Sequence, residues 1–196
     1  MALLKQQIVG KHVRRLRTEN GISLRGLASQ TGFSPSFMSQ VENGQVSPSI
    51  SSMERIAEAL GVTLGEFFAA AAEGEGGLIV RAVDRQGLTS AWSSAEIEAL
   101  SMPRPAVRLD PVLITLHPGG RSAKHPYAHS REEFAFVLEG RVTLTLGPDR
   151  HRLKKGDAAT ILPQELRLWV NEFARPARIL IVSGRFGSPA QARARR

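Results

Sequence analysis

Cysteine is absent from this chain of 196 residues, which also has a single tyrosine and no long uninterrupted hydrophobic segment. Without thiols the protein forms neither disulfides nor thiolate metal sites, and this composition suits the reducing interior of a cell. No apolar run approaches the roughly 20 residues that cross a membrane. The N-terminus, MALLKQQIVGKHVRRLR, lacks the apolar core and cleavage site of a secretion signal. We therefore expect a cytoplasmic protein without a membrane partner.

Acidic residues are fewer than basic ones, with 18 Asp and Glu against 26 Lys and Arg, which gives a net charge of +8. The excess is spread over the whole chain and is not gathered in one long basic run. Because a basic protein favours polyanionic partners, the balance is compatible with nucleic acid binding. This charge balance is weak support for nucleic acid binding, because a charge that is spread over the chain identifies no binding surface.

The chain divides into two parts of different character. The stretch AAEGEGG, residues 71–77, is rich in glycine and small residues, and such a stretch buries little surface. We predict a helical domain over residues 1–70, a linker over 71–77, a β-rich domain over 78–186 and a disordered basic tail over 187–196. The predicted fold class is α+β with two domains.

The first part has the apolar spacing of five α-helices. Ser34 followed by Pro35 predicts the start of the third helix, because Ser accepts a hydrogen bond from a free helix N–H and Pro suits the first helical position. Ser23 is the predicted cap of the second helix, and Gly44 follows the end of the third. The predicted core consists of Ile8, Val13, Leu16, Leu24, Leu27, Ala28, Met38, Val41, Ile50, Met53, Ile56, Ala57, Leu60, Leu64, Phe67 and Phe68.

The second part consists of short runs rich in Val, Ile, Leu and Thr, separated by Gly, Pro and Asp. The runs are LIVRAV, PVLITL, FAFVL, RVTLTL, AATIL, LRLWV and ARILIV. Closely spaced strands of this kind are typical of a β-sandwich or a barrel.

The stretch SLRGLASQTGFSPSFMSQVENG resembles the helix-turn-helix of Xre-family regulators, and the resemblance extends over about residues 8–68. It implies that Ser36 and Gln40 read base edges. The basic run KHVRRLR, which includes Arg14 and Arg15, is expected to supply further contacts to the DNA backbone. Four more residues match phosphate-contacting positions, namely Arg25, Ser34, Ser39 and Asn43. Such contacts set the register without reading sequence.

Two alternatives stay open for the helical part. Phe37 lies on the same helix, where it touches either a thymine methyl or, alternatively, the protein core. The whole motif also has an alternative, a helical interaction module that binds no DNA.

The stretches HPGGRSAKHPYAHSREEFAFVLEG and LKKGDAATILPQELRLWVN resemble the two motifs of a cupin, a small double-stranded β-helix barrel. In metal-binding cupins these motifs supply three histidines and one glutamate. By that resemblance His129 and Glu133 are retained, whereas Tyr127 replaces one histidine and Arg167 or Leu168 replaces another. An arginine there opposes cation binding, so we expect neither a metal nor another cofactor. His125 is the one alternative ligand, since residues 125, 127 and 129 alternate to the same side.

A helix-turn-helix joined to a cupin resembles a class of bacterial transcriptional regulators. The resemblance implies a non-enzyme that binds double-stranded operator DNA, senses a small molecule and forms a homodimer through its cupin domain. The expected ligand pocket consists of Tyr127, His129, Glu133, Arg167 and Trp169. Because an arginine favours carboxylate or phosphate, we expect an anionic effector. The alternatives are a mononuclear-metal oxygenase or epoxidase, and a cupin that serves only to dimerise.

The sequence also predicts an internal ion pair between Arg17 and Glu42. By the resemblance, Arg17 ends the first helix and Glu42 ends the recognition helix. A carboxylate at a helix C-terminus lies at the unfavourable end of the helix dipole and needs a cationic partner. Alternatively, both side chains are solvated, and the pair then contributes little to the stability of the fold.

Overall fold

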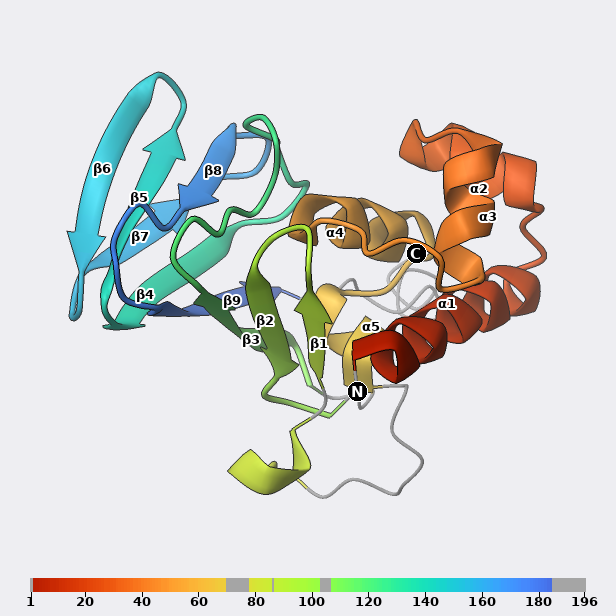
Figure 1. The fold of residues 1–196 in the computed structure, drawn as a ribbon, viewed down its shortest axis with the longest axis horizontal. Helices are drawn as coiled ribbons and strands as arrows, with labels where there is room; N and C mark the ends of the chain where they lie inside the picture. Colours follow the sequence, from red (N-terminus) through yellow and green to blue (C-terminus); the bar gives the residue numbers. More distant parts are fainter. Residues whose placement is uncertain (1, 70–77, 86, 103–106, 185–196) are drawn as a thin grey trace, which may run out of the picture.

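The computed structural model describes residues 2–69, 78–85, 87–102 and 107–184 (Figure 1). The predicted linker 71–77 and basic tail 187–196 lie outside these ranges, as does the side chain of Ile8. The helices of the first part are α1 (Ala2–Glu19), α2 (Leu24–Thr31), α3 (Pro35–Glu42), α4 (Ile50–Ala59) and α5 (Leu64–Ala69). The predicted five-helix arrangement is confirmed.

The predicted helix starts and ends are found where the sequence placed them. The side chain of Ser23 accepts a hydrogen bond of 3.0 Å from the N–H of Gly26, and that of Ser34 accepts one of 3.1 Å from Phe37. Gly44 follows α3 with φ +66°, a left-handed conformation that favours glycine. Local capping chemistry therefore sets the boundaries of the recognition helix.

The helical core also follows the sequence pattern. Of the predicted core residues with described side chains, Leu16 and Leu24 are only partly buried. The others are buried, namely Val13, Leu27, Ala28, Met38, Val41, Ile50, Met53, Ile56, Ala57, Leu60, Leu64, Phe67 and Phe68.

The second part forms two antiparallel sheets that face each other as a barrel. The larger sheet has strand order β1-β2-β3-β9-β4-β7 and the smaller has β6-β5-β8. The strands are β1 (Gly87–Ser90), β2 (Ala95–Ala99), β3 (Leu109–Leu116), β4 (Glu133–Glu139), β5 (Arg141–Leu146), β6 (Asp149–Lys154), β7 (Ala158–Ile161), β8 (Arg167–Val170) and β9 (Ala177–Gly184). Side chains alternate between the inside and the outside, as in β2, where Ala95, Ile97 and Ala99 are buried.

The strand expected over residues 78–83 is wrong. Leu78, Ile79 and Val83 are exposed by 82%, 76% and 89%, and a short 3-10 helix spans Ala82–Asp84. An apolar run becomes a strand only when a neighbouring strand accepts its hydrogen bonds, and no such partner lies beside this run among the described residues. The strands β1, β2 and β6 were not among the predicted runs, because small or polar residues dominate them.

Helices α4 and α5 pack directly on the barrel, with α4 lying between the strands and helices α2 and α3 (Figure 1). The N–H of Ser51 donates to the carbonyl of Ser122 at 3.1 Å, and the N–H of Gly65 donates to Asp110 at 3.0 Å. A side chain at position 65 would collide with the Asp110 carboxylate, because a Cβ there would lie 2.2 Å from Oδ1. Direct hydrogen bonds therefore hold the two parts together.

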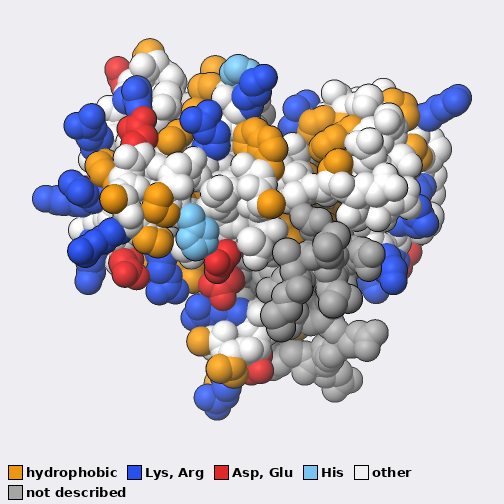
Figure 2. Space-filling model, in the orientation of Figure 1, with side chains coloured by type: hydrophobic (Ala, Val, Ile, Leu, Met, Phe, Trp, Pro, Cys, Tyr) orange, Lys and Arg blue, Asp and Glu red, His pale blue; other side chains and the backbone are white. Residues whose placement is uncertain are grey.

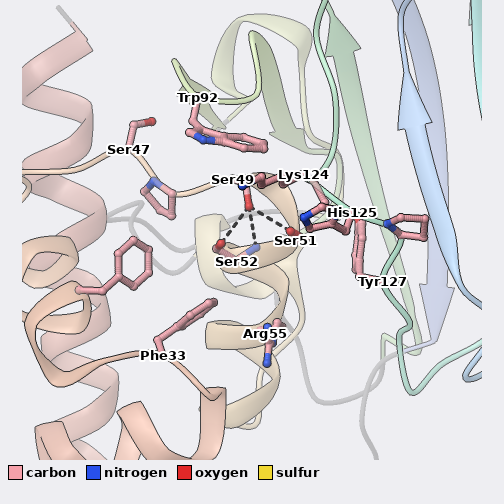
Figure 3. Close-up of a pocket in the computed structure, with 14 residues that line it drawn as sticks. Phe33, Ser47, Ser49, Ser51, Ser52, Arg55, Trp92, Lys124, His125 and Tyr127 are labelled. Carbon is pink, nitrogen blue, oxygen red and sulfur yellow. Dashed lines mark hydrogen bonds between the residues drawn. The ribbon is translucent and has the colours of Figure 1, made fainter.

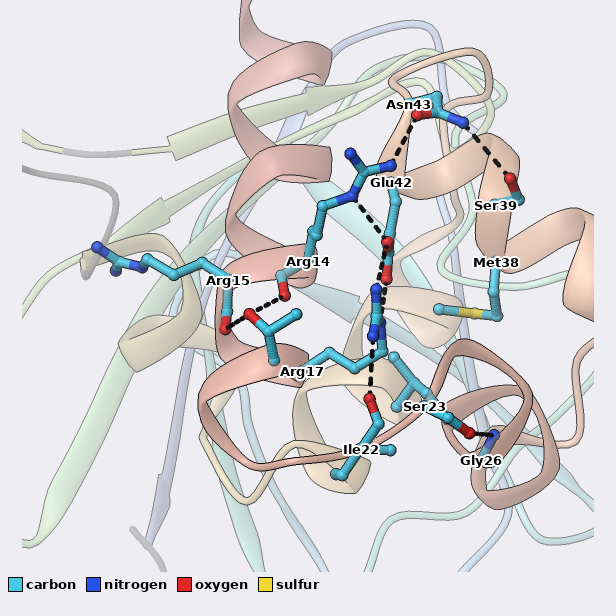
Figure 4. A network of polar contacts seen from close by, with 12 residues as sticks. Arg14, Arg15, Arg17, Ile22, Ser23, Gly26, Met38, Ser39, Glu42 and Asn43 are labelled. Atoms are coloured by element: carbon cyan, nitrogen blue, oxygen red, sulfur yellow. Dashed lines mark hydrogen bonds and ion pairs between the residues drawn. The ribbon is translucent and has the colours of Figure 1, made fainter.

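The predicted ion pair between Arg17 and Glu42 is confirmed (Figure 4). Arg17 Nε lies 2.6 Å from Glu42 Oε1, Arg17 Nη2 lies 3.0 Å from Oε2, and Arg14 Nε lies 3.1 Å from Oε2. The Glu42 side chain is 1% exposed. Burial alone would raise the pKa of Glu42, but Arg17 and Arg14 outweigh it and hold the pKa below 4.5. This pair joins the end of α1 to the end of α3.

We expect Glu42→Gln to lower the free energy of unfolding by about 3–5 kcal/mol, because it leaves the Arg17 guanidinium partly buried without its partner. Urea unfolding followed by circular dichroism measures this loss. The control is Glu19→Gln, since Glu19 pairs with Arg15 at 3.8 Å on the surface, where a pair contributes about 1 kcal/mol at most. Equal midpoints for the two variants would contradict the prediction.

The stabilising effect of Glu42 should also depend on pH. Because its folded-state pKa lies below the ordinary 4.5, its contribution is present above that pH and is lost as the pH falls through the folded value. The difference between the parent and Glu42→Gln should therefore shrink below about pH 4.

Candidate functional site

The outward face of α3 carries the residues expected to read DNA. Ser36 and Gln40 are exposed, and Ser39 is half-buried. Their position on a capped helix next to α2 is that of a recognition helix, whose N-terminal residues contact base edges in the major groove. The structure therefore leaves this face accessible.

The residues expected to hold phosphates have different surroundings. Arg25 is exposed, whereas Ser34 is engaged in capping α3. Arg14 Nη2 donates to Asn43 Oδ1 at 3.0 Å, in addition to its contact with Glu42, and Arg15 lies beside His12 at 3.2 Å. Arg14 remains 54% exposed, so it supports the end of α3 and still faces solvent. Basic side chains are scattered over the visible face of both parts (Figure 2).

Phe37 packs against the protein, as its alternative interpretation held. Its ring lies 4.9 Å from that of Phe33, and it is half-buried. Both rings line a cleft of about 420 Å³ between the helices and the barrel. Trp92 and Tyr127 from the barrel part line the same cleft (Figure 3). The cleft is shared by both parts, and its four aromatic side chains stand beside serine side chains of the α3–α4 segment and the cationic Arg55 and Lys124.

The barrel interior holds a cluster of charged side chains around Arg167, which is 1% exposed. Arg167 Nε lies 2.9 Å from Glu133 Oε2, and Arg167 Nη2 donates to Glu133 Oε1 at 3.0 Å. The guanidinium also lies over the Tyr127 ring, 4.6 Å from its centroid. Leu168 is only half-buried, so Arg167 is the residue that occupies the position of the missing histidine.

A residue that sequence reasoning missed completes this cluster. Glu54 from α4 enters the barrel, and Arg167 Nη2 lies 3.3 Å from its Oε2 and 3.4 Å from its Oε1. Glu54 is 7% exposed. Glu54 is separated from Arg167 by 113 positions in the chain. The one sign of its role in the sequence is that an acidic residue stands on an otherwise apolar helix face.

Burial shifts the protonation of the cluster. It raises the pKa of Glu133 to about 7, with Arg167 offsetting part of the effect, and it also raises the pKa of Glu54. Burial together with Arg131 and Arg167 lowers the pKa of His129 to about 3, so the imidazole is neutral near pH 7. One guanidinium therefore contacts two carboxyl groups, and burial opposes the ionisation of both.

The residues present do not fit a metal ion. The guanidinium of Arg167 lies against Glu133, and Arg131 Nη2 lies 3.1 Å from His129 Nε2, so a cation lies beside each retained ligand. His125, the alternative ligand, is exposed and lines the cleft. Within the described ranges, no group of three or more His, Cys, Asp or Glu is arranged for a metal.

Little room remains inside the barrel. A cavity of about 10 Å³ lies among Glu54, Tyr127, Arg167 and Trp169, roughly the volume that one water needs. Arg167 Nη1 and Trp169 Nε1 are buried there without a hydrogen-bond partner among the described residues. The expected pocket residues Tyr127, Arg167 and Trp169 thus meet at one cavity, while His129 lies behind it beside Arg131.

Family models match both parts of the chain. A helix-turn-helix domain matches residues 8–68 and a cupin domain matches residues 112–183. The chain is a helix-turn-helix protein with a C-terminal cupin domain. This helix-turn-helix cupin protein is 27% identical over 153 residues to the HTH-type transcriptional regulator PuuR of Escherichia coli, covering 78% of this chain and 81% of the relative.

One solved structure agrees with this architecture over nearly the whole chain, and one further relative matches a short part of it. The crystal structure of an HTH_3 family transcriptional regulator from Vibrio cholerae superimposes with a TM-score of 0.73 at 22% identity, covering 93% of this chain and 98% of that one. The uncharacterized HTH-type transcriptional regulator y4dJ of Sinorhizobium fredii is 33% identical over 58 residues, which are 30% of this chain and 75% of that protein. No helix among the described residues is long and apolar enough to cross a membrane.

The double substitution Arg131→Ala, Arg167→His should create a metal site in the cupin domain. It removes the cation beside each retained ligand and places an imidazole next to Glu133, which together with His129 makes the two-His-one-carboxylate set of many iron sites. We expect the purified variant to bind about one Ni²⁺ or Fe²⁺ per chain, measured by elemental mass spectrometry after dialysis.

The parent protein should bind far less metal than one ion per chain. The double variant Arg131→Ala, Arg167→Met is the matched control, because it removes both cations without adding a ligand. Stoichiometric metal in the parent that is lost on His129→Ala would contradict our interpretation of the cluster.

Proposed function

We propose that the protein is a cytoplasmic, sequence-specific transcriptional regulator whose cupin domain senses a small molecule. The observation that carries the proposal is the accessible face of α3, with Ser36 and Gln40 exposed within a helix-turn-helix domain. The similarity to PuuR over 78% of the chain supports it, since a match of 153 residues extends into both parts.

Recognition of operator DNA would follow from the chemistry of α3. A Gln amide pairs bidentately with the adenine edge in the major groove, which suits Gln40. Ser36 is small enough to approach a base closely, and the half-buried Ser39 and exposed Asn43 lie along the same helix. Arg25, Arg14 and Arg15 are positioned to contribute phosphate contacts, which provide affinity at any sequence.

An enzymatic role has little support. The oxygenase or epoxidase alternative needs a metal held by histidine and carboxylate, and the cations beside His129 and Glu133 oppose one. The nearly filled barrel favours the other alternative, a cupin that serves only for dimerisation. We nevertheless propose a sensor, because the two buried donors without partners are the groups that a ligand would satisfy.

A homodimer through the cupin domain is the third part of the proposal. Phe134 on β4 is 46% exposed and lies in register between Thr160 on β7 and Val182 on β9. Together with Leu109, which is 61% exposed, it lines a groove of about 680 Å³. An exposed apolar patch of this kind suits association, and a dimer places two recognition helices about 34 Å apart.

We expect Gln40→Ala to weaken binding to the preferred DNA sequence by about 1–3 kcal/mol and to relax one base position. The preferred sequence is first selected from random duplex DNA with the full-length protein, and affinities are then measured by fluorescence anisotropy. Gln30→Ala, an exposed change on α2, is the control. If Gln40→Ala lowers affinity for selected and scrambled duplexes equally, Gln40 reads no base.

We expect Phe134→Glu to convert the dimer to a monomer, because it replaces an exposed aromatic side chain of the groove with a charge. Light scattering after size-exclusion chromatography measures the mass at micromolar concentration. Val83→Glu changes an even more exposed residue outside the sheets and should remain dimeric. A Phe134→Glu protein of unchanged dimeric mass would place the interface elsewhere.

A further inference from the structure

Glu54 belongs to the helix-turn-helix domain but ends inside the cupin barrel. It is carried by α4, and its carboxylate reaches Arg167 on β8. Arg167 already has a closer partner in Glu133, at 2.9 and 3.0 Å against 3.3 and 3.4 Å for Glu54. One guanidinium can balance at most one carboxylate, so the cluster holds one carboxyl group more than Arg167 requires. Glu54, which also has a hydrogen bond with Tyr127, is therefore the more distant of the two carboxylate partners of Arg167.

Two buried hydrogen-bond donors beside Glu54 do not receive a hydrogen-bond acceptor from it. Arg167 Nη1 and Trp169 Nε1 line the same small cavity as Glu54, and neither has a hydrogen-bond partner among the described residues. Arg167 and Trp169 are 1% and 2% exposed. A buried donor without an acceptor is unfavourable, so this site lacks an acceptor that a correctly placed anion provides.

No ligand fits while Glu54 is in place. The remaining cavity of about 10 Å³ is smaller than any organic molecule. The cleft of about 420 Å³ lies on the other side of Tyr127, which lines both spaces. A ligand whose bulk occupies the cleft would reach Arg167 past the Tyr127 side chain, and its polar end would then take the position of Glu54.

We propose that Glu54 is a built-in occupant of the effector site, and that the effector carries a carboxylate which replaces Glu54 on Arg167. This inference rests on the proposed sensor function. A carboxylate is favoured over a phosphate because the exchange keeps the charge of the barrel constant, whereas a dianion would meet Glu133. A cationic ligand would face the guanidinium of Arg167, which is always charged.

Replacement of Glu54 would release α4 from the barrel. The same helix is held there by hydrogen bonds from the N–H groups of Ile50 to Ser93 and of Ser51 to Ser122. Its other side packs in the helical core through Met53 and Ile56. Effector and DNA would therefore be coupled through α4, and such coupling changes affinity only to the extent that the ligand prefers one arrangement.

The test is rescue of a cavity variant by acetate. Glu54→Ala removes the CH₂ and carboxylate of the side chain, which acetate replaces in shape and charge. We expect acetate to raise the melting temperature of Glu54→Ala, with an apparent dissociation constant about tenfold or more below that of the parent, where Glu54 competes. Acetamide and chloride at equal concentration should have no such effect.

The matched control is Glu58→Ala, which removes a negative charge one turn further along α4. Acetate that stabilises Glu54→Ala no more than Glu58→Ala would overturn the proposal. Should Glu54→Ala fail to fold, Glu54→Gln keeps the size of the side chain without its charge. Acetate should then bind Glu54→Gln more tightly than it binds the parent, and equal affinity would overturn the proposal.

DNA binding separates this inference from the proposed function. Acetate should change the affinity of Glu54→Ala for the selected duplex by about 5- to 150-fold and leave Glu58→Ala unchanged. If acetate binds Glu54→Ala and DNA affinity does not move, the coupling through α4 is overturned. If the parent protein selects no sequence at all, the regulator function fails, whatever acetate does in the barrel.

Discussion

The guanidinium of Arg167 is the constraint on which the rest of the cupin domain depends. An arginine stays charged in any protein environment, and this one is 1% exposed inside the barrel. A buried charge must be paired, which commits Glu133 to a salt bridge instead of to a metal. It also attracts Glu54 from α4, so the second carboxylate comes from the other domain. One substitution at a metal-ligand position thus changes the chemistry of the barrel and ties it to the helices.

Two buried clusters of opposite composition organise the molecule. In the helical domain one carboxylate, Glu42, is gripped by Arg17 and Arg14, and the excess positive charge reaches solvent. In the barrel one guanidinium, Arg167, faces Glu133 and Glu54, and burial raises the pKa of both acids. The first cluster is well satisfied and holds the recognition helix in place. In the second cluster Glu54 lies farther from Arg167 than Glu133 does. A site where a ligand exchanges with a side chain needs such a partner.

Helix α4 is the element that belongs to both domains. Its apolar side chains complete the helical core, while Glu54 and the backbone of Ser51 contact the barrel. A helix shared by two cores cannot shift in one without disturbing the other, because packed interiors leave little free space. For the proposed regulator, this arrangement offers a short physical route between the barrel interior and the helical domain.

The sequence by itself determined the features that depend on neighbouring residues. Ser23 and Ser34 were recognised as caps because capping is local, and the buried faces of the helices followed from their period of 3.6 residues. Family spacing located the Arg17–Glu42 pair and narrowed the departure to Arg167 or Leu168. Tertiary structure alone decided that Glu54 enters the barrel, that Phe37 faces a cleft, and that residues 78–83 remain outside the sheets. Each of these features depends on which distant segment of the chain packs against the residue. Such long-range contacts produce no periodic pattern in the sequence.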